Sequence, residues 1–162
     1  MRAVSEDLGL CLGPSARDRR TMRHWGTAPR RQRLAEGEVQ VFRASLDSPS
    51  VPAPELLPLL SEVERVRARR FCFEHDRDRF VAGRGTLRLL LGAYLAEEPE
   101  RLVFAYGPRG KPSLKDAADV RFNVSHSAGL ALLAFAWGVD VGVDLERERP
   151  VPEAAEIAAR LF

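Results

Sequence analysis

The clearest pattern of hydrophobic and polar positions lies between residues 121 and 146. It predicts a short strand, a polar turn, and two further strands joined by a tight reversal. From residue 139 to residue 146, valine or leucine alternates with aspartate, glycine or glutamate, which is the period of a strand with one buried face. Because side chains two residues apart leave a strand on the same face, Asp144 and Glu146 are expected to lie side by side, with Cα atoms about 6–7 Å apart.

Upstream of this region, helical and strand-like patterns alternate along the chain. Ser61 and Glu64 have the spacing of a capping box and predict the start of a basic helix that runs to about Arg70. The longest helix is expected over residues 76–95, and Pro99 follows it. Other expected elements are a strand at 38–44, a loop at 46–54, a short helix at 56–60, a strand at 102–106, a turn at 107–110 and a helix beginning at 153. This mixture predicts an α+β fold.

Phe80, Leu87 and Leu91 mark the face of the longest helix that is expected to form the core of the first half of the chain. The arginines of this helix fall elsewhere on the helical wheel, and those of the preceding basic helix are typical of a solvated face. Gly83 and Gly85 each lower helix propensity by about 1 kcal/mol relative to alanine. Glycines in such places permit close packing against a neighbour or a ligand.

Composition indicates one soluble globular domain. The chain has 162 residues, of which 45% are hydrophobic and 30% are charged. Cys11 and Cys72 are far apart and form no C-x-x-C motif, so we expect a reducing, cytoplasmic location with neither a disulfide framework nor a zinc site. No apolar run reaches the roughly 18 residues that would span a membrane.

The net charge of +2 is unevenly distributed. Residues 1–36 hold eight arginines against four acidic residues, whereas the rest of the chain holds 17 basic and 19 acidic residues. This leader has few periodic apolar residues and is expected to be disordered. Its arginine pairs are not followed by an apolar stretch and are not interleaved with aromatic residues, so neither export nor nucleic-acid binding is indicated.

The paired carboxylates of Asp144 and Glu146 are the first candidate site. Two negative charges at this spacing repel each other unless a cation or hydrogen-bond donors lie between them. Oxygen ligands of this kind suit Mg²⁺, which proteins often hold with one or two carboxylates together with substrate phosphates. The alternative interpretation is a solvated strand end that continues into the charged residues 147–149.

A second candidate site lies upstream, where Asn123, Ser125, His126 and Ser127 crowd a turn in which Gly129 can take a positive φ. Hydroxyl, imidazole and backbone N–H groups can bind a phosphate, and histidine can carry charge near neutral pH. A serine nucleophile is an alternative, but adjacent strand residues point to opposite faces and no G-x-S-x-G elbow surrounds Ser125. Capping of the turn is the purely structural interpretation.

Three motifs occur in order along the chain. They are Gly110-Lys111-Pro112, the FNVSHS of residues 122–127 and the VGVDLE of residues 141–146. Together they resemble the 4′-phosphopantetheinyl transferases of the Sfp type. The stretch from Arg69-Arg70-Phe71 through Asp78-Arg79, with Gly83 beyond it, is also similar to the N-terminal region of that family. The resemblance covers roughly residues 38–162.

The resemblance implies a reaction, a fold and a set of binding residues. Members of the family use Mg²⁺ to transfer the phosphopantetheine arm of coenzyme A to a serine of an apo acyl or peptidyl carrier protein. Their fold is a pseudo-twofold pair of α/β halves with coenzyme A at the junction. Asp144 and Glu146 match metal ligands of the family. The residues that match coenzyme A contacts are Arg67, Arg79, Gly110, Lys111, Pro112, Ser125 and His126, with Arg67 and His126 toward the ribose 3′-phosphate.

The same resemblance predicts how the chain is divided. We expect a leader at residues 1–36, an N-terminal α/β half at 37–120, and the opening strands of the second half at 121–162. The third motif of the family, a tryptophan followed by Lys-Glu in a helix, does not occur after Asp144. The chain therefore resembles a C-terminally truncated member, and we assign it no catalytic residue.

Two functions from different classes remain open. The chain is either a transferase whose third-motif groups come from another chain, or an inactive remnant that at most binds coenzyme A or a carrier protein. A generic nucleotide-binding module is not favoured, because the sequence contains neither a G-x-x-x-x-G-K-[ST] nor a G-x-G-x-x-G loop.

Overall fold

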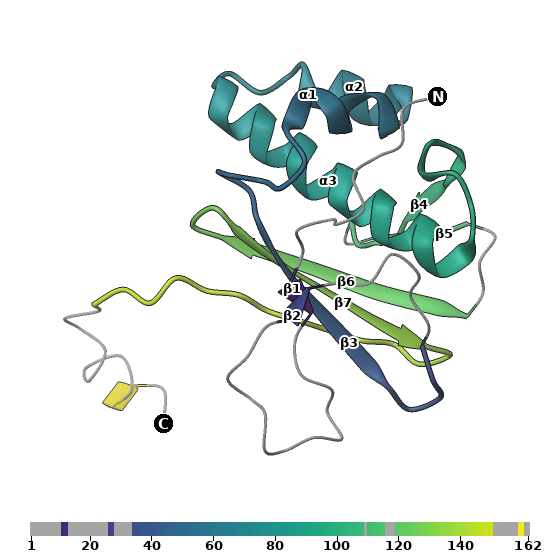
Figure 1. Ribbon diagram of the computed structural model, residues 1–162. Coiled ribbons are helices and arrows are strands. Elements are labelled where there is room, and N and C mark those ends of the chain that lie inside the picture. The colour runs from purple at the N-terminus through teal and green to yellow at the C-terminus, as the bar shows by residue number, and fades with distance from the viewer. Residues whose placement is uncertain are drawn as a thin grey trace.

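A computed structural model of the chain describes residues 11–12, 26–27, 34–108, 110–115, 119–150 and 159–160. A five-stranded antiparallel sheet, in the order β2-β1-β3-β7-β6, carries the helices on one face (Figure 1). A separate hairpin, β4-β5, lies beside the longest helix. The strands are β1 (Cys11–Leu12), β2 (Gly26–Thr27), β3 (Val39–Ser45), β4 (Phe104–Tyr106), β5 (Pro112–Leu114), β6 (Val120–Ser127) and β7 (Leu130–Trp137). The helices are α1 (Ala53–Leu56), α2 (Glu62–Ala68) and α3 (Glu74–Leu95), with short 3₁₀ turns η1 (Leu57–Leu59) and η2 (Pro99–Arg101). The predicted α+β class is confirmed.

Local signals placed most of these elements correctly. The capping box of α2 is complete, because Ser61 Oγ accepts the N–H of Glu64 at 3.3 Å and a carboxylate oxygen of Glu64 accepts the N–H of Ser61 at 2.8 Å. Short β5 was not predicted. It begins at Pro112, two residues after the end of the predicted turn, and pairs with β4. Of the leader, the described residues are those of β1 and β2 together with residues 34–36, so the predicted disorder of the remainder lies outside the described residues. The predicted helix from 153 does too, apart from residues 159–160.

The β6-β7 hairpin is joined by a two-residue turn at Ala128 and Gly129, whose φ values are 50° and 78°. Positive φ at both central residues matches the right-handed twist of the strands it joins, so the predicted reversal at Gly129 is confirmed. The turn is shorter than predicted, because Asn123, Ser125, His126 and Ser127 lie in β6 and pair with β7. β7 also pairs along its length with β3. The strands that we grouped with a second half therefore share one sheet with the first predicted strand.

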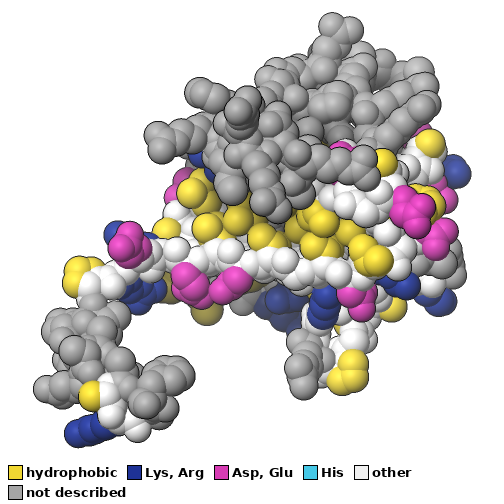
Figure 2. All heavy atoms as spheres, turned by 90° about the horizontal axis from the view of Figure 1, so that it is seen from below, with side chains coloured by type: hydrophobic (Ala, Val, Ile, Leu, Met, Phe, Trp, Pro, Cys, Tyr) yellow, Lys and Arg dark blue, Asp and Glu magenta, His cyan; other side chains and the backbone are white. Residues whose placement is uncertain are grey.

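The prediction of a third strand at residues 139–146 is wrong. Gly138, at φ 69°, turns the chain out of β7, and residues 140–150 form no strand ladder. They run back extended along the side of the sheet that faces away from the helices (Figure 1). Figure 2 shows that face, where hydrophobic side chains gather beside a row of acidic ones. The alternation itself persists, since Val143 and Leu145 are half-buried while Asp144 and Glu146 are exposed.

The core lies between the sheet and α3. Phe42 of β3 and Phe135 of β7 are fully buried, with ring centroids 5.7 Å apart in an edge-to-face arrangement. Leucines from the helical layer cover them, namely Leu56, Leu60, Leu87, Leu90 and Leu91. Arg88, which the helical wheel places off the apolar face, is nevertheless only 1% exposed, and its partners are described below.

Two glycines of α3 offer a matched test of this packing. A Cβ at Gly85 would lie 2.6 Å from the Cβ of Leu56, whereas one at Gly83 would meet only Leu46 Cδ2, at 3.5 Å. We expect Gly85→Ala to destabilise the protein by about 1–3 kcal/mol through overpacking. Gly83→Ala should leave stability unchanged or raise it by up to about 1 kcal/mol through helix propensity. Urea unfolding measures both, and equal effects would contradict the close approach of α1 to α3.

Candidate functional site

The main candidate site is a cavity of about 430 Å³ between α2, α3 and the β6-β7 turn, which we call the basic pocket. Three predicted coenzyme A contacts with basic side chains line it: Arg67 from α2, Arg79 from α3 and His126 from β6. Pro112 and Gly83 also line it. Residues from three separate parts of the sequence thus converge on one hollow. Its lining has three arginines against one carboxylate, Asp76, and this excess of positive charge suits an anionic ligand.

Two phenylalanines, Phe71 and Phe80, contribute to the wall of the basic pocket. The guanidinium of Arg67 lies over the ring of Phe80, with its carbon 5.2 Å from the ring centroid. Phe71 packs against Phe80 at 5.4 Å between centroids and also lines the pocket. A cation held over an aromatic face keeps its charge while losing rotational freedom. The pocket therefore combines fixed positive charge with flat apolar surfaces, a combination that suits a phosphorylated ligand with a ring system.

Arg79 is engaged at the rim of the basic pocket. Its Nε and Nη2 donate hydrogen bonds to Oδ1 and Oδ2 of Asp47. The hydrogen bond from Arg79 lowers the pKa of Asp47, and the same bond raises the pKa of Arg79. Asp47 also lies so close to Gly129 that a Cβ there would clash with its carboxylate. This ion pair fastens the end of β3 to α3 beside the hairpin turn.

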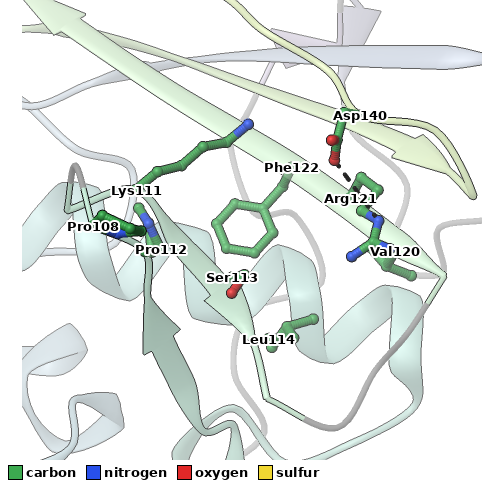
Figure 3. A pocket seen from close by; sticks show the side chains of 10 residues that line it. Pro108, Lys111, Pro112, Ser113, Leu114, Val120, Arg121, Phe122 and Asp140 are labelled. Atoms are coloured by element: carbon green, nitrogen blue, oxygen red, sulfur yellow. Dashed lines mark ion pairs between the residues drawn. The ribbon is translucent and has the colours of Figure 1, made fainter.

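A second hollow of about 410 Å³, which we call the lysine pocket, adjoins the basic pocket, since Pro112 lines both. Figure 3 shows Lys111 and Pro112 at one side of it, the ring of Phe122 in its floor, and the ion pair of Arg121 with Asp140, 3.9 Å apart. The predicted contact Gly110 lies in the preceding turn at φ 74°, and its N–H bonds to Gly107 O. Lys111 Nζ donates to the carbonyl of Val141 at 3.3 Å.

Asp144 and Glu146 lie on the far side of β6 from His126, in residues 140–148, which we call the acidic segment. The Oγ of Ser125 donates to Asp144 Oδ1 at 3.0 Å and accepts the N–H of Leu145 at 3.0 Å. Ser125 and His126 therefore act on opposite faces of the strand, as their adjacent positions require. This separation leaves no serine–histidine contact for a nucleophilic pair.

The acidic segment supplies two of the oxygen-bearing side chains that a divalent cation could bind. Both carboxylates are exposed, and they stand two residues apart on an extended backbone. Within the described ranges, no group of three or more His, Cys, Asp or Glu side chains is placed to hold a metal. Two carboxylates with phosphate oxygens from a substrate are a ligand set that Mg²⁺ accepts. The donor chemistry thus fits Mg²⁺ bound together with a phosphorylated ligand.

Arg84 is a residue of the basic pocket that we did not predict. It lines the pocket four residues after Phe80, on the same face of α3, and its side chain is 11% exposed. Its guanidinium lies over Phe104, with the carbon 5.1 Å from the ring centroid. The helical spacing from Phe80 is the signal that could have identified it. Its burial depends on Phe104 of the β4-β5 hairpin. The periodicity of α3 alone cannot reveal that contact.

Behind this wall lies a buried charge cluster. Oε2 of Glu64, a residue only 3% exposed, accepts Arg88 Nε at 2.8 Å, and Oε1 pairs with Arg84 Nε at 3.5 Å. The guanidinium of Arg88 also donates to the carbonyls of Pro99 and Leu102. Within the described part of the chain, Arg84 Nη1 and Glu64 Oε1 have no hydrogen-bond partner. The cluster joins α2, α3 and η2 beneath the basic pocket.

Fold and site together define an α+β protein with a basic pocket on one face of β6 and exposed carboxylates on the other. A family profile described as 4′-phosphopantetheinyl transferase, N-terminal, matches residues 53–137. The profile spans more than half of the chain, so the chain belongs to the 4′-phosphopantetheinyl transferase family, and the resemblance noted in the sequence is confirmed. None of the helices in the described ranges has the length and hydropathy of a membrane span.

Individual relatives agree with this assignment. The chain is 42% identical over 141 residues to the 4′-phosphopantetheinyl transferase HetI of a Nostoc species. The aligned region covers 85% of this chain and 60% of HetI. The chain is 32% identical over 108 residues to psf-1 of Bacillus pumilus, covering 67% of this chain and 45% of that protein. It is 29% identical over 106 residues to Sfp of Bacillus subtilis, covering 65% and 46%. The chain thus spans about half of the length of these curated relatives.

Proposed function

We propose that this chain binds coenzyme A and supports transfer of its 4′-phosphopantetheine arm to a serine of an apo carrier protein. The observation that carries the proposal is the convergence of Arg67, Arg79 and His126 on the basic pocket. Family membership supports the reaction class. In this proposal the basic pocket takes the phosphorylated nucleotide, and Arg67 and His126 face its 3′-phosphate.

The lysine pocket extends this binding surface. Lys111 lies in the turn between β4 and β5, where Pro112 fixes the backbone beside it. In our proposal its ammonium attracts phosphate oxygens of the bound nucleotide, in addition to the carbonyl contact it makes in this structure. In this proposal the apolar residues that line the lysine pocket, such as Leu114 and Phe122, would limit the access of water to the phosphates and so strengthen these charge interactions.

The reaction joins the serine Oγ of the carrier to the phosphorus of the phosphopantetheine arm. The bridging P–O bond of the pyrophosphate breaks, and adenosine 3′,5′-bisphosphate leaves. Mg²⁺, when bound, neutralises charge on the pyrophosphate oxygens. In this proposal Asp144 and Glu146 would hold the cation, and the basic pocket would orient the leaving nucleotide. No residue of this chain is assigned as the acceptor of the serine proton.

Intact-mass spectrometry tests the proposed function. An apo carrier protein is incubated with this chain, coenzyme A and Mg²⁺, and a mass gain of one phosphopantetheine arm that EDTA abolishes would support a working transferase. A matched reaction uses a chimera in which the C-terminal part of HetI follows residue 150. Modification by the chimera alone would support the alternative that this chain by itself is inactive. No modification by either would contradict the proposal.

His126 gives a second, binding-level prediction. We expect His126→Ala to weaken coenzyme A about tenfold, because a charge-assisted hydrogen bond to the 3′-phosphate is lost. Binding of the analogue that lacks the 3′-phosphate should change less than twofold. Calorimetry measures both, with His75→Ala, an exposed histidine that does not line the basic pocket, as the control. Equal losses for the two ligands would remove His126 from this role.

A further inference from the structure

β6 presents polar side chains at alternate positions toward the acidic segment. Their oxygens accept backbone N–H groups that also occur at alternate positions, so the two stretches advance together in steps of two residues. The contacts are Asn123 Oδ1 with the N–H of Val143 at 3.0 Å, Ser125 Oγ with that of Leu145 at 3.0 Å, and Ser127 Oγ with that of Arg147 at 3.1 Å.

These contacts replace the backbone ladder that the sequence led us to expect. Because side chains at 123, 125 and 127 leave one face of β6, the acidic segment lies over that face and not in the plane of the sheet. A slip of one residue would turn the bonded N–H groups away from their acceptors. The side-chain contacts therefore set the register of the acidic segment, and with it the direction in which its carboxylates project.

Within the described residues, Ser125 has a further contact that Asn123 and Ser127 lack. Its hydroxyl carries a single proton, and that proton is directed to Asp144 Oδ1 at 3.0 Å. The hydroxyl therefore has no second proton for a phosphate oxygen while this contact is made. A carboxylate has about four lone-pair positions, so Asp144 keeps Oδ2 and one side of Oδ1 for another ligand.

We propose that Asn123, Ser125 and Ser127 are positioning residues, which fix the register of the acidic segment and orient the carboxylate of Asp144 for a divalent cation. The part that concerns the cation rests on the proposed function. Ser125, which the family resemblance assigns to a phosphate contact, acts here through Asp144. The role of His126 in the basic pocket is separate, because it lies on the other face of β6.

Amide hydrogen exchange by NMR on the full chain tests the register directly. Protection should alternate, with slow exchange at residues 143, 145 and 147 and faster exchange at 144 and 146. Asn123→Ala should lower protection at Val143 about fivefold to tenfold, the equilibrium equivalent of one net hydrogen bond. Ser125→Ala should do the same at Leu145. Ser113→Ala is the matched control, because this exposed serine of β5 is not among the residues that hydrogen-bond to the amides of the acidic segment.

Paramagnetic broadening by Mn²⁺ tests the positioning role without any turnover. The Mn²⁺ concentration that half-maximally broadens the amides of residues 144–146 should rise about tenfold in Ser125→Ala. Ser125→Thr retains the hydroxyl and should restore the parent value within about twofold. The urea midpoint should be nearly the same in all of these variants, which separates a positioning effect from general destabilisation.

Several outcomes would overturn the inference. Uniformly fast exchange in the parent, or unchanged protection in Asn123→Ala and Ser125→Ala, would remove the register role. No broadening in the parent, or lost protection in Ser125→Ala without a change in the Mn²⁺ response, would remove the role toward the cation. Failure of the parent and the chimera to modify a carrier protein would contradict the proposed transfer, whereas the exchange and Mn²⁺ results decide this inference.

Discussion

Glu64→Ala is expected to lower the free energy of unfolding by about 3–5 kcal/mol, because it leaves a buried guanidinium without its carboxylate. Arg88 is 1% exposed, and after the substitution its remaining hydrogen-bond acceptors among the described residues would be the carbonyls of Pro99 and Leu102. The N–H of Ser61 would also lose its capping acceptor. A domain of this size has about 5–15 kcal/mol of stability in total, so a substantial fraction of the variant should be unfolded at physiological temperature.

The control for this prediction is Glu62→Ala, two residues earlier in the same helix. Glu62 pairs with Arg65 and Arg69, and its side chain is 66% exposed. Exposed ion pairs of this kind contribute about 0–1 kcal/mol, so we expect a correspondingly small change. Urea unfolding measures both variants, and their midpoints are compared provided that the dependence of the unfolding free energy on urea concentration is the same in each. If Glu64→Ala does not fold well enough to be measured, Glu64→Gln retains the side-chain volume and removes only the charge. Similar midpoints for Glu62→Ala and both Glu64 variants would contradict the buried cluster.

Asp144→Ala should reduce carrier modification about a thousandfold or more while leaving the fold intact. If Asp144 is a metal ligand, its removal deprives the reaction of charge stabilisation that a bound cation supplies, an effect of several kcal/mol. The side chain is exposed and bonds only to Ser125 within the described residues, so little stability is expected to be lost. The intact-mass assay measures transfer, in this chain or in the HetI chimera, whichever is active.

Glu148→Ala is the matched control, since it removes a carboxylate from the same segment. Its side chain is exposed and lines neither the basic pocket nor the lysine pocket, and it stands outside the predicted metal ligands. We expect transfer within about twofold of the parent. Parent-like activity in Asp144→Ala would refute the metal assignment. A comparable loss in both variants would indicate a general effect of negative charge, such as recruitment of the partner protein.

The sequence identified the family before the structure placed any side chain. Three short motifs in fixed order were enough, because each of them depends on local residue types that remain recognisable along the chain. Local signals also located the capping box of α2 and the hairpin turn at Gly129, where a few neighbouring residues determine the backbone. Elements whose stability is local were therefore predicted well.

Other features depended on contacts between distant segments. The period-two pattern at 139–146 correctly indicated which side chains face solvent, but it could not distinguish a sheet strand from an extended segment held by the side chains of β6. Periodicity reports which face is buried and says nothing of what bonds to the backbone. Likewise, the helical wheel could not reveal that Arg88 would be buried, because its carboxylate partner lies 24 residues away.

The sequence by itself determined the family, the α+β class and the residue types of the candidate site. Only the tertiary structure brought Arg67, Arg79 and His126 to one pocket and placed Ser125 on the opposite face with Asp144. The physical reason is that motifs are encoded by neighbours in the chain, whereas a binding site depends on how the sheet and helices pack. That packing is set by the combined burial of many side chains and cannot be read from any one segment.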